Sequence, residues 1–169
     1  VFWRTGKTDR SELTVAAVNA VWPAIIFSRT RHGADRLART LGQNGIATAA
    51  IHGGRNQRQR NQALADFADG KVQALVATDV AARGIHVDGV ASVIHYDPPE
   101  DHKAYIHRSG RTARAGGSGL AVTLVLWNQE LEVKRMQKRL GLDIPIVEMF
   151  SNDPRLGDLT GWDPAAVAH

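Results

Sequence analysis

The chain has 169 residues, of which 43% are hydrophobic, 22% charged and 6% aromatic, and its formal charge is +4; these values suit a single globular domain with its own core. The absence of cysteine excludes disulfides and thiolate metal sites and makes a reducing cytoplasm the expected location. No apolar run approaches membrane-spanning length and no signal peptide is visible, so we expect no membrane association.

The first part of the chain alternates short apolar runs with helical patterns. It opens without Met on VFWRT, which has the pattern of a first strand, so we expect a piece of a longer protein. Ala34, Leu37, Ala38 and Leu41 recur at helical spacing, and Asn56 is a candidate N-cap. The predicted elements are a helix near 11–20, strands at 24–28 and 47–54, and helices at 30–45 and 56–70.

The same alternation continues through the rest of the chain. Strands are predicted at 72–79, 91–97, 119–126 and 144–149, and helices at 100–110 and 128–141. Strands that are apolar on both faces and alternate with helices indicate an α/β fold with a parallel sheet covered on both sides. Periodicity is lost from about residue 148, so we expect a domain at 1–147 and a C-terminal extension or linker at 148–169.

Polar clusters follow the predicted strands, in the segments SRTRHG, HGGRNQRQR, ATDVAARG and YDPPEDH. Loops at the carboxyl ends of parallel strands form the ligand-binding edge of such sheets. A further segment, HRSGRTARAG, places Arg108, Arg111 and Arg114 three residues apart after a predicted helix. Such arginines repel one another unless an anion neutralises them; the alternatives are a bound phosphate or a solvated basic helix end.

The segment RTGKT at residues 4–8 is similar to the end of a P-loop, whose full pattern has a glycine five residues before the second glycine. With Gly6 as the second glycine, the first would fall on Val1, and we expect no apolar strand before the loop. No other Gly-Lys-Ser/Thr occurs in the chain. We therefore expect a polar turn here and no site that holds nucleotide phosphates by itself.

Four segments in order, IIFSRT, HGGRNQRQR, ATDVAARGIHV and HRSGRTARAG, resemble the motifs of the second RecA-like domain of superfamily 2 helicases, and most closely those of the DEAD-box RNA helicases. The resemblance covers about residues 20–126. It implies a RecA-like three-layer domain with a central, mainly parallel sheet flanked by helices. It also implies an N-terminal RecA-like domain that carries the P-loop, the acidic box and Mg²⁺, with ATP and RNA bound across the cleft between the two domains.

The resemblance implies that Arg111 and Arg114 are arginine fingers for ATP. Gly84 and position 86 would face the nucleotide, where the family usually has an aspartate that binds the ribose; this chain has His86, a poorer acceptor, which predicts weaker ATP binding. Interdomain and coupling roles fall to four further residues. These are Asp79, Arg83, His107 and Arg108. From the residues alone, Asp79 could equally cap a turn, and His107 could be structural.

The resemblance assigns RNA-backbone contacts to residues at or after the carboxyl ends of three of the predicted strands. These are Thr30, Arg31, Gly53, Gln57, Arg60 and Thr78. Glycines let a backbone approach phosphate closely, although a basic surface helix would give the same arginine pattern at 55–60. Phe27 is expected in the core, and the low aromatic content argues against base-stacking platforms. Backbone contacts predict sequence-independent, salt-sensitive binding.

Three functions are compatible with this pattern. The first is the C-terminal lobe of an ATP-dependent DEAD-box RNA helicase, inactive without its N-terminal lobe. The second is a DNA-acting superfamily 2 helicase domain, since phosphate contacts do not distinguish RNA from DNA. The third is a non-catalytic nucleic-acid or protein interaction module with the same fold, for which His86 gives slight support.

Overall fold

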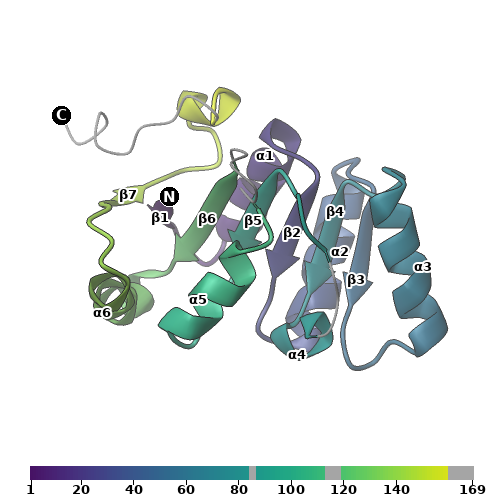
Figure 1. The fold of residues 1–169 in the computed structure, drawn as a ribbon. Coiled ribbons are helices and arrows are strands. Elements are labelled where there is room, and N and C mark those ends of the chain that lie inside the picture. Colours follow the sequence, from purple (N-terminus) through teal and green to yellow (C-terminus); the bar gives the residue numbers. More distant parts are fainter. Residues whose placement is uncertain (84–86, 113–118, 160–169) are drawn as a thin grey trace.

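A computed structural model describes residues 1–83, 87–112 and 119–159 (Figure 1). Seven strands form one sheet in the order β3-β4-β2-β5-β6-β1-β7, and every described pairing is parallel. The strands are β1 (Phe2–Arg4), β2 (Ala24–Phe27), β3 (Thr48–Ile51), β4 (Ala74–Ala77), β5 (Ser92–His95), β6 (Leu120–Val125) and β7 (Ile146–Glu148). The predicted RecA-like fold class, with a parallel central sheet between helices, is therefore confirmed.

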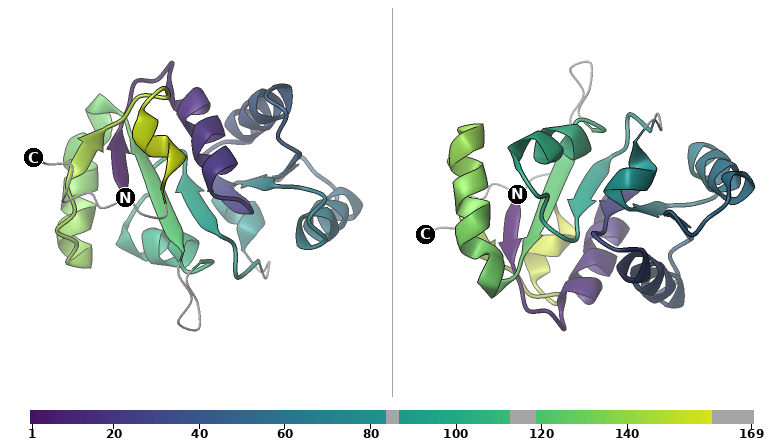
Figure 2. Two further views of the ribbon diagram at one scale, coloured as in Figure 1. Left: turned by 90° about the horizontal axis from the view of Figure 1, so that it is seen from above. Right: turned by 90° about the horizontal axis from the view of Figure 1, so that it is seen from below.

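Helices cover both faces of the sheet (Figures 1 and 2). They are α1 (Arg10–Ala20), α2 (Arg31–Gln43), α3 (Gln57–Ala68), α4 (Asp79–Ala82), α5 (His102–Ser109) and α6 (Glu130–Leu140), with 3-10 turns η2 (Trp127–Gln129) and η3 (Pro154–Gly157). Alternate residues of β2 enter different cores: Ile26 packs with α1 and α2, whereas Ile25 and Phe27 pack with α3 and α4. This division follows from the two-residue period of strands.

Local capping explains where the site-bearing helices begin. Thr30 accepts a hydrogen bond from the backbone N–H of Gly33 at 3.0 Å and starts α2. Asn56 and Gln59 form a reciprocal capping box at the start of α3. The Asp101 carboxylate accepts from the N–H of Ala104 at 2.8 Å and starts α5. Each cap satisfies a donor that the first helical turn leaves without a partner, so the loops before these helices have fixed conformations.

The structure corrects one part of the P-loop argument. Strand β1 does precede Gly6, and the polar turn that follows leads into α1. The missing first glycine at Val1 is therefore the feature that excludes a P-loop. In the described ranges, no helix is both long and apolar enough to cross a membrane.

The described part of the C-terminal extension, up to residue 159, packs against the domain; η3 lies beside α1 in Figure 2. The side chains of Met149, Leu156 and Leu159 are buried in the core formed by α1, α2 and the sheet. Ser151 reinforces the contact, because its N–H and its hydroxyl donate to the Asp9 carboxylate at 3.0 and 2.7 Å. Residues 160–169 lie outside the described structure.

We expect Met149→Ala to lower the free energy of unfolding by about 2–5 kcal/mol, because Met149 is fully buried and its truncation leaves a cavity. The neighbouring variant Phe150→Ala is the matched control, since Phe150 is 57% exposed and its loss should change stability by less than about 0.5 kcal/mol. Urea denaturation of the two variants measures the difference. Equal stabilities would show that the extension does not contribute to the core.

Candidate functional site

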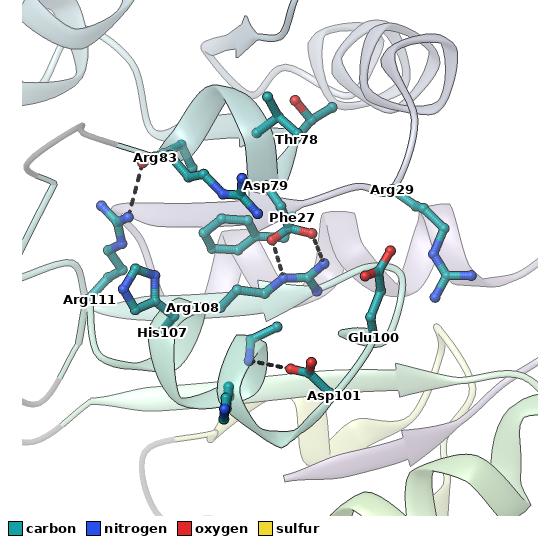
Figure 3. Close-up of a pocket in the computed structure, with 14 residues that line it drawn as sticks. Phe27, Arg29, Thr78, Asp79, Arg83, Glu100, Asp101, His107, Arg108 and Arg111 are labelled. Atoms are coloured by element: carbon teal, nitrogen blue, oxygen red, sulfur yellow. Dashed lines mark hydrogen bonds and ion pairs between the residues drawn. The ribbon is translucent and has the colours of Figure 1, made fainter.

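A pocket of about 480 Å³ opens at the carboxyl ends of β2, β4 and β5 (Figure 3). After β2 the chain forms β3 and β4 on one side of it and then crosses to form β5 and β6 on the other side, so the pocket lies where the connections change direction. Such switch points bind ligands in open α/β sheets. The pocket is lined by Phe27, Arg29, Thr78, Asp79, Val80, Ala82, Arg83, Glu100, Asp101, Lys103, Ala104, His107, Arg108 and Arg111.

Arg108 and Asp79 form the central ion pair of the pocket. Arg108 Nε donates to Asp79 Oδ1 at 2.7 Å and Nη2 donates to Oδ2 at 2.5 Å, a bidentate arrangement. Nη1 donates to the Asp97 carbonyl at 2.8 Å, and the guanidinium lies 5.1 Å from the Phe27 ring centroid. Because Arg108 is only 3% exposed, these contacts compensate the loss of water around its charge.

His95 lies behind Arg108 at the end of β5. Its Nδ1 is 3.3 Å from Arg108 Nη1, and its Nε2 is 3.1 Å from the Ser109 hydroxyl. Burial, and secondly the nearby Arg108 charge, hold the pKa of His95 well below its ordinary value near 6.5. His95 is therefore neutral in the folded protein at neutral pH. Burial also raises the pKa of the Tyr105 phenol, whose ring stacks on His95.

Arg111 lies on the pocket wall at the end of the segment that follows α5. Its Nη2 donates to the Ala82 carbonyl at 3.2 Å, and its side chain is largely buried. Its backbone carbonyl accepts from the Val90 N–H at 3.2 Å, and the Thr112 hydroxyl donates to the Val90 carbonyl at 2.6 Å. These contacts fix both the backbone and the guanidinium of Arg111 relative to α4.

The other residues predicted to bind ATP or to couple the two lobes fall into two groups, those at the pocket and those outside the described structure. The side chains of Arg83 and His107 are exposed and line the pocket together with Asp79 and Arg111 (Figure 3). Gly84, His86 and Arg114 lie outside the described residues. In residues 1–83, 87–112 and 119–159, no three His, Asp or Glu side chains come together as a metal site.

The loop after β3 contains the predicted RNA-side residue Gly53. The His52 ring shapes this loop: its Nδ1 accepts from the Gly54 N–H at 3.0 Å, and its Nε2 donates to Asp35 at 2.8 Å. The side chain of Arg31 lies over the same loop, since a Cβ on Gly53 would be 3.7 Å from Arg31 Cδ. Arg31 and Gly53 are thus brought together at the surface, although they are far apart in the sequence.

The other predicted RNA-side residues lie along the same edge but differ in their contacts. Thr30 is the N-cap of α2, and Thr78 precedes α4 with its side chain buried. Gln57 is exposed at the start of α3 and donates to Asn61 at 2.8 Å. Arg60 donates to the Ala81 carbonyl at 3.0 Å, so it also supports α4.

Sequence reasoning missed Asp97 and His95 as site residues. The Asp97 carboxylate accepts from Arg10 at 2.9 Å and from the backbone N–H of Arg29 at 2.7 Å, and its carbonyl accepts from Arg108. It thereby joins α1, the loop after β2 and α5. The available signal was the position of Asp97 in the YDPPEDH cluster directly after a buried strand.

The family model described as helicase conserved C-terminal domain matches residues 11–116. The structure is similar to the E. coli DEAD-box protein SrmB, solved bound to regulator of ribonuclease activity A, with 34% identity, 88% of each chain covered and a TM-score of 0.76. The chain belongs to this family, as the C-terminal domain of a DEAD-box helicase. The recognition made from the four sequence motifs is therefore confirmed.

Two other relatives define how much of a DEAD-box protein the chain represents. The DEAD-box ATP-dependent RNA helicase RhpA of Helicobacter pylori is 37% identical over 150 residues, which are 88% of this chain and 30% of RhpA. S. cerevisiae Dbp5, solved bound to RNA and ADP BeF3, is 28% identical with a TM-score of 0.78, covering 90% of this chain and 42% of that one. The chain thus spans less than half the length of either relative.

The neutral state of His95 predicts a pH dependence of stability. Below pH ~6.5 the unfolded DEAD-box domain binds a proton at His95 that the folded domain does not bind, so stability should fall as pH falls. The contribution is at most about 1.4 kcal/mol per pH unit. Urea denaturation at a series of pH values should therefore give a steeper acid loss for the parent chain than for His95→Asn.

The comparison with His95→Asn is needed because a second group titrates in the same range. Burial lowers the pKa of the Val1 amino group to about 6, which also destabilises the folded state as pH falls. This contribution is common to the parent chain and the variant, so it cancels in their difference. Parallel stability curves would mean that His95 is not held neutral by the fold.

Proposed function

We propose that the chain is the second RecA-like lobe of an ATP-dependent RNA helicase, in which Arg111 and Arg114 act as arginine fingers for ATP bound by an N-terminal lobe. The observation that carries the proposal is the position of Arg111 on the pocket wall. Its side chain is largely buried, and its Nη2 donates to the carbonyl of Ala82 at 3.2 Å. Arg111 is thus fixed in position, as a group that stabilises transition-state charge must be.

The residues of the pocket fit a phosphate ligand contributed by another lobe. Arg83, Lys103 and Arg111 bring positive charge to the walls, and Arg108 is already neutralised from within. The chain itself has no complete P-loop, because Val1 stands where its first glycine would be. The N-terminal lobe would therefore hold the nucleotide phosphates and Mg²⁺, and Gly84 and His86 would approach the ribose. Dbp5, a relative with the same fold, is known bound to RNA and ADP BeF3, which supports RNA and an adenine nucleotide as the ligands of the two-lobe protein.

The RNA would cross the other half of the same edge, after β2, β3 and β4. The loop at Gly53 and the side chain of Arg31 present a compact, basic surface there, with the Thr30 cap beside it. Gln57, exposed at the first position of α3, extends this surface. Contacts of this kind reach phosphates and sugars, so binding would be largely independent of base sequence.

Replacing Arg111 with Ala in the protein that includes the N-terminal lobe should lower kcat for RNA-stimulated ATP hydrolysis by about 10³- to 10⁵-fold, the range attributed to arginine fingers. RNA affinity should change little, because Arg111 lies at the pocket and not at the Gly53 loop. Steady-state kinetics measures both quantities. Arg139→Ala, at an exposed position of α6, is the matched control and should retain normal turnover.

Three outcomes would contradict this proposal. Unchanged turnover in Arg111→Ala would favour a non-catalytic module. Robust ATP hydrolysis by the 169-residue chain alone would exclude the proposed division between lobes. Stronger stimulation of the two-lobe protein by single-stranded DNA than by RNA would favour the DNA-acting alternative.

A second variant tests the RNA surface. Arg31→Ala should weaken RNA binding for all base sequences alike and reduce the slope of log affinity against log salt by about 0.7–1, the value for one lost phosphate contact. Fluorescence anisotropy with two unrelated single-stranded RNAs at several salt concentrations measures this. Arg36→Ala, one turn further along α2 and also exposed, should leave the slope unchanged. A loss confined to one RNA sequence would indicate base recognition instead.

A further inference from the structure

His95 lies in a row of rings that crosses the sheet beneath α5. Phe27, His95 and Thr123 are aligned in register on β2, β5 and β6. The His95 ring stacks between Phe27 and Tyr105, with centroid distances of 6.4 and 5.1 Å. The imidazole is fully buried, so its plane and its two nitrogen atoms have fixed directions.

The hydrogen-bond partners of His95 determine its tautomer. The atom facing Nδ1 is Arg108 Nη1, which can only donate, so Nδ1 must be the unprotonated acceptor. The proton is then on Nε2, which donates to the Ser109 hydroxyl at 3.1 Å. A protonated ring would place a second positive charge 3.3 Å from the guanidinium inside the protein, and no carboxylate contacts that ring in the described structure.

We propose that His95 is a positioning residue, whose Nδ1 holds Arg108 in the orientation that pairs it with Asp79 and so fixes α5 against α4. The role of this contact in catalysis rests on the proposed function, because residues of α4 and α5 line the pocket. Asp79 fixes one edge of the guanidinium through Nε and Nη2. His95 and the Asp97 carbonyl fix the other edge through Nη1, and Phe27 supports its face.

Loss of the His95 acceptor would leave Nη1 with the Asp97 carbonyl as its other partner in the described structure. The groups facing His95 are Arg108, Ser109 and Tyr105 from α5 and Phe27 from β2, with the Val1 amino group as a further nearby charge. Nη1 of Arg108 therefore has two acceptors in the described structure, the His95 Nδ1 and the Asp97 carbonyl.

Two substitutions separate the two nitrogen positions of the ring. The side-chain oxygen of Asn can occupy the position of Nδ1, so His95→Asn keeps an acceptor for Arg108. The amide of Gln reaches the position of Nε2, so His95→Gln keeps polarity near Ser109 and removes that acceptor. Thr123→Val controls for packing, because Thr123 is buried beside His95 and its hydroxyl has no hydrogen-bond partner in the described structure.

The readout is the Nε–H signal of Arg108 in ¹⁵N NMR spectra of the 169-residue chain, assigned by its loss in Arg108→Lys. In the parent chain, burial and the Asp79 contact should make this proton exchange slowly with water. Its exchange should be roughly 10- to 100-fold faster in His95→Gln, as expected when a hydrogen bond to a charged group is lost. It should remain slow in His95→Asn and Thr123→Val.

A second measurement does not depend on any His95 variant folding. Long-range ¹H–¹⁵N spectra of the parent chain should show His95 as the Nε2–H tautomer, without titration between pH ~6 and ~8. An Nδ1–H tautomer, a titrating ring, or equal exchange at Arg108 in the Asn and Gln variants would overturn the proposal. Neither readout uses ATP or RNA, so failure here is distinct from failure of the proposed function.

Discussion

The ion pair between the buried Arg108 and the solvent-accessible Asp79 is the interaction on which the geometry of the pocket depends. A charge as buried as that of Arg108 destabilises a fold unless it is paired and hydrogen-bonded. Here the bidentate carboxylate, the Asp97 carbonyl and the His95 nitrogen together provide those partners. Since the partners come from α4 and from the end of β5, satisfying one guanidinium fixes the positions of three elements.

This pair also separates the roles of arginines that are alike in sequence. Because Arg108 and Arg111 are three residues apart, the sequence makes both of them candidates for phosphate binding. Their positive charges repel each other unless an anion lies nearby. For Arg108 that anion is Asp79, within the same chain. The Arg111 guanidinium lies on the pocket wall, where its Nη2 donates to the Ala82 carbonyl. The spacing alone could not assign these roles, because the deciding contacts are made with residues 29 positions away.

Sequence periodicity predicted the strands and long helices because their burial is regular. It did not predict α4, which has four residues and is too short to show a helical period. It also extended the third strand through His52, Gly53 and Gly54, where the structure has a turn held by the His52 ring. Burial of Met149 and Leu156 depends on a chain segment returning to α1, a contact that no local pattern contains. The motif resemblance pointed to the sheet edge at which the pocket opens, but Asp97 was missed since its partners Arg10 and Arg108 are distant in sequence.

The short helix α4 connects the two halves of the sheet edge. Its first residue, Asp79, binds Arg108, and its last carbonyl, that of Ala82, accepts from Arg111. From the opposite side, Arg60 of α3 donates to the carbonyl of Ala81. Arginines from α3 and from the segment after α5 therefore bind adjacent carbonyl groups of one helical turn. With so few residues, α4 has little internal stability of its own, so these three arginines and the burial of Ala81 and Ala82 in the core hold it in place. Arg60, on the proposed RNA side, and Arg111, on the pocket side, are thus connected through neighbouring carbonyl groups of one short helix.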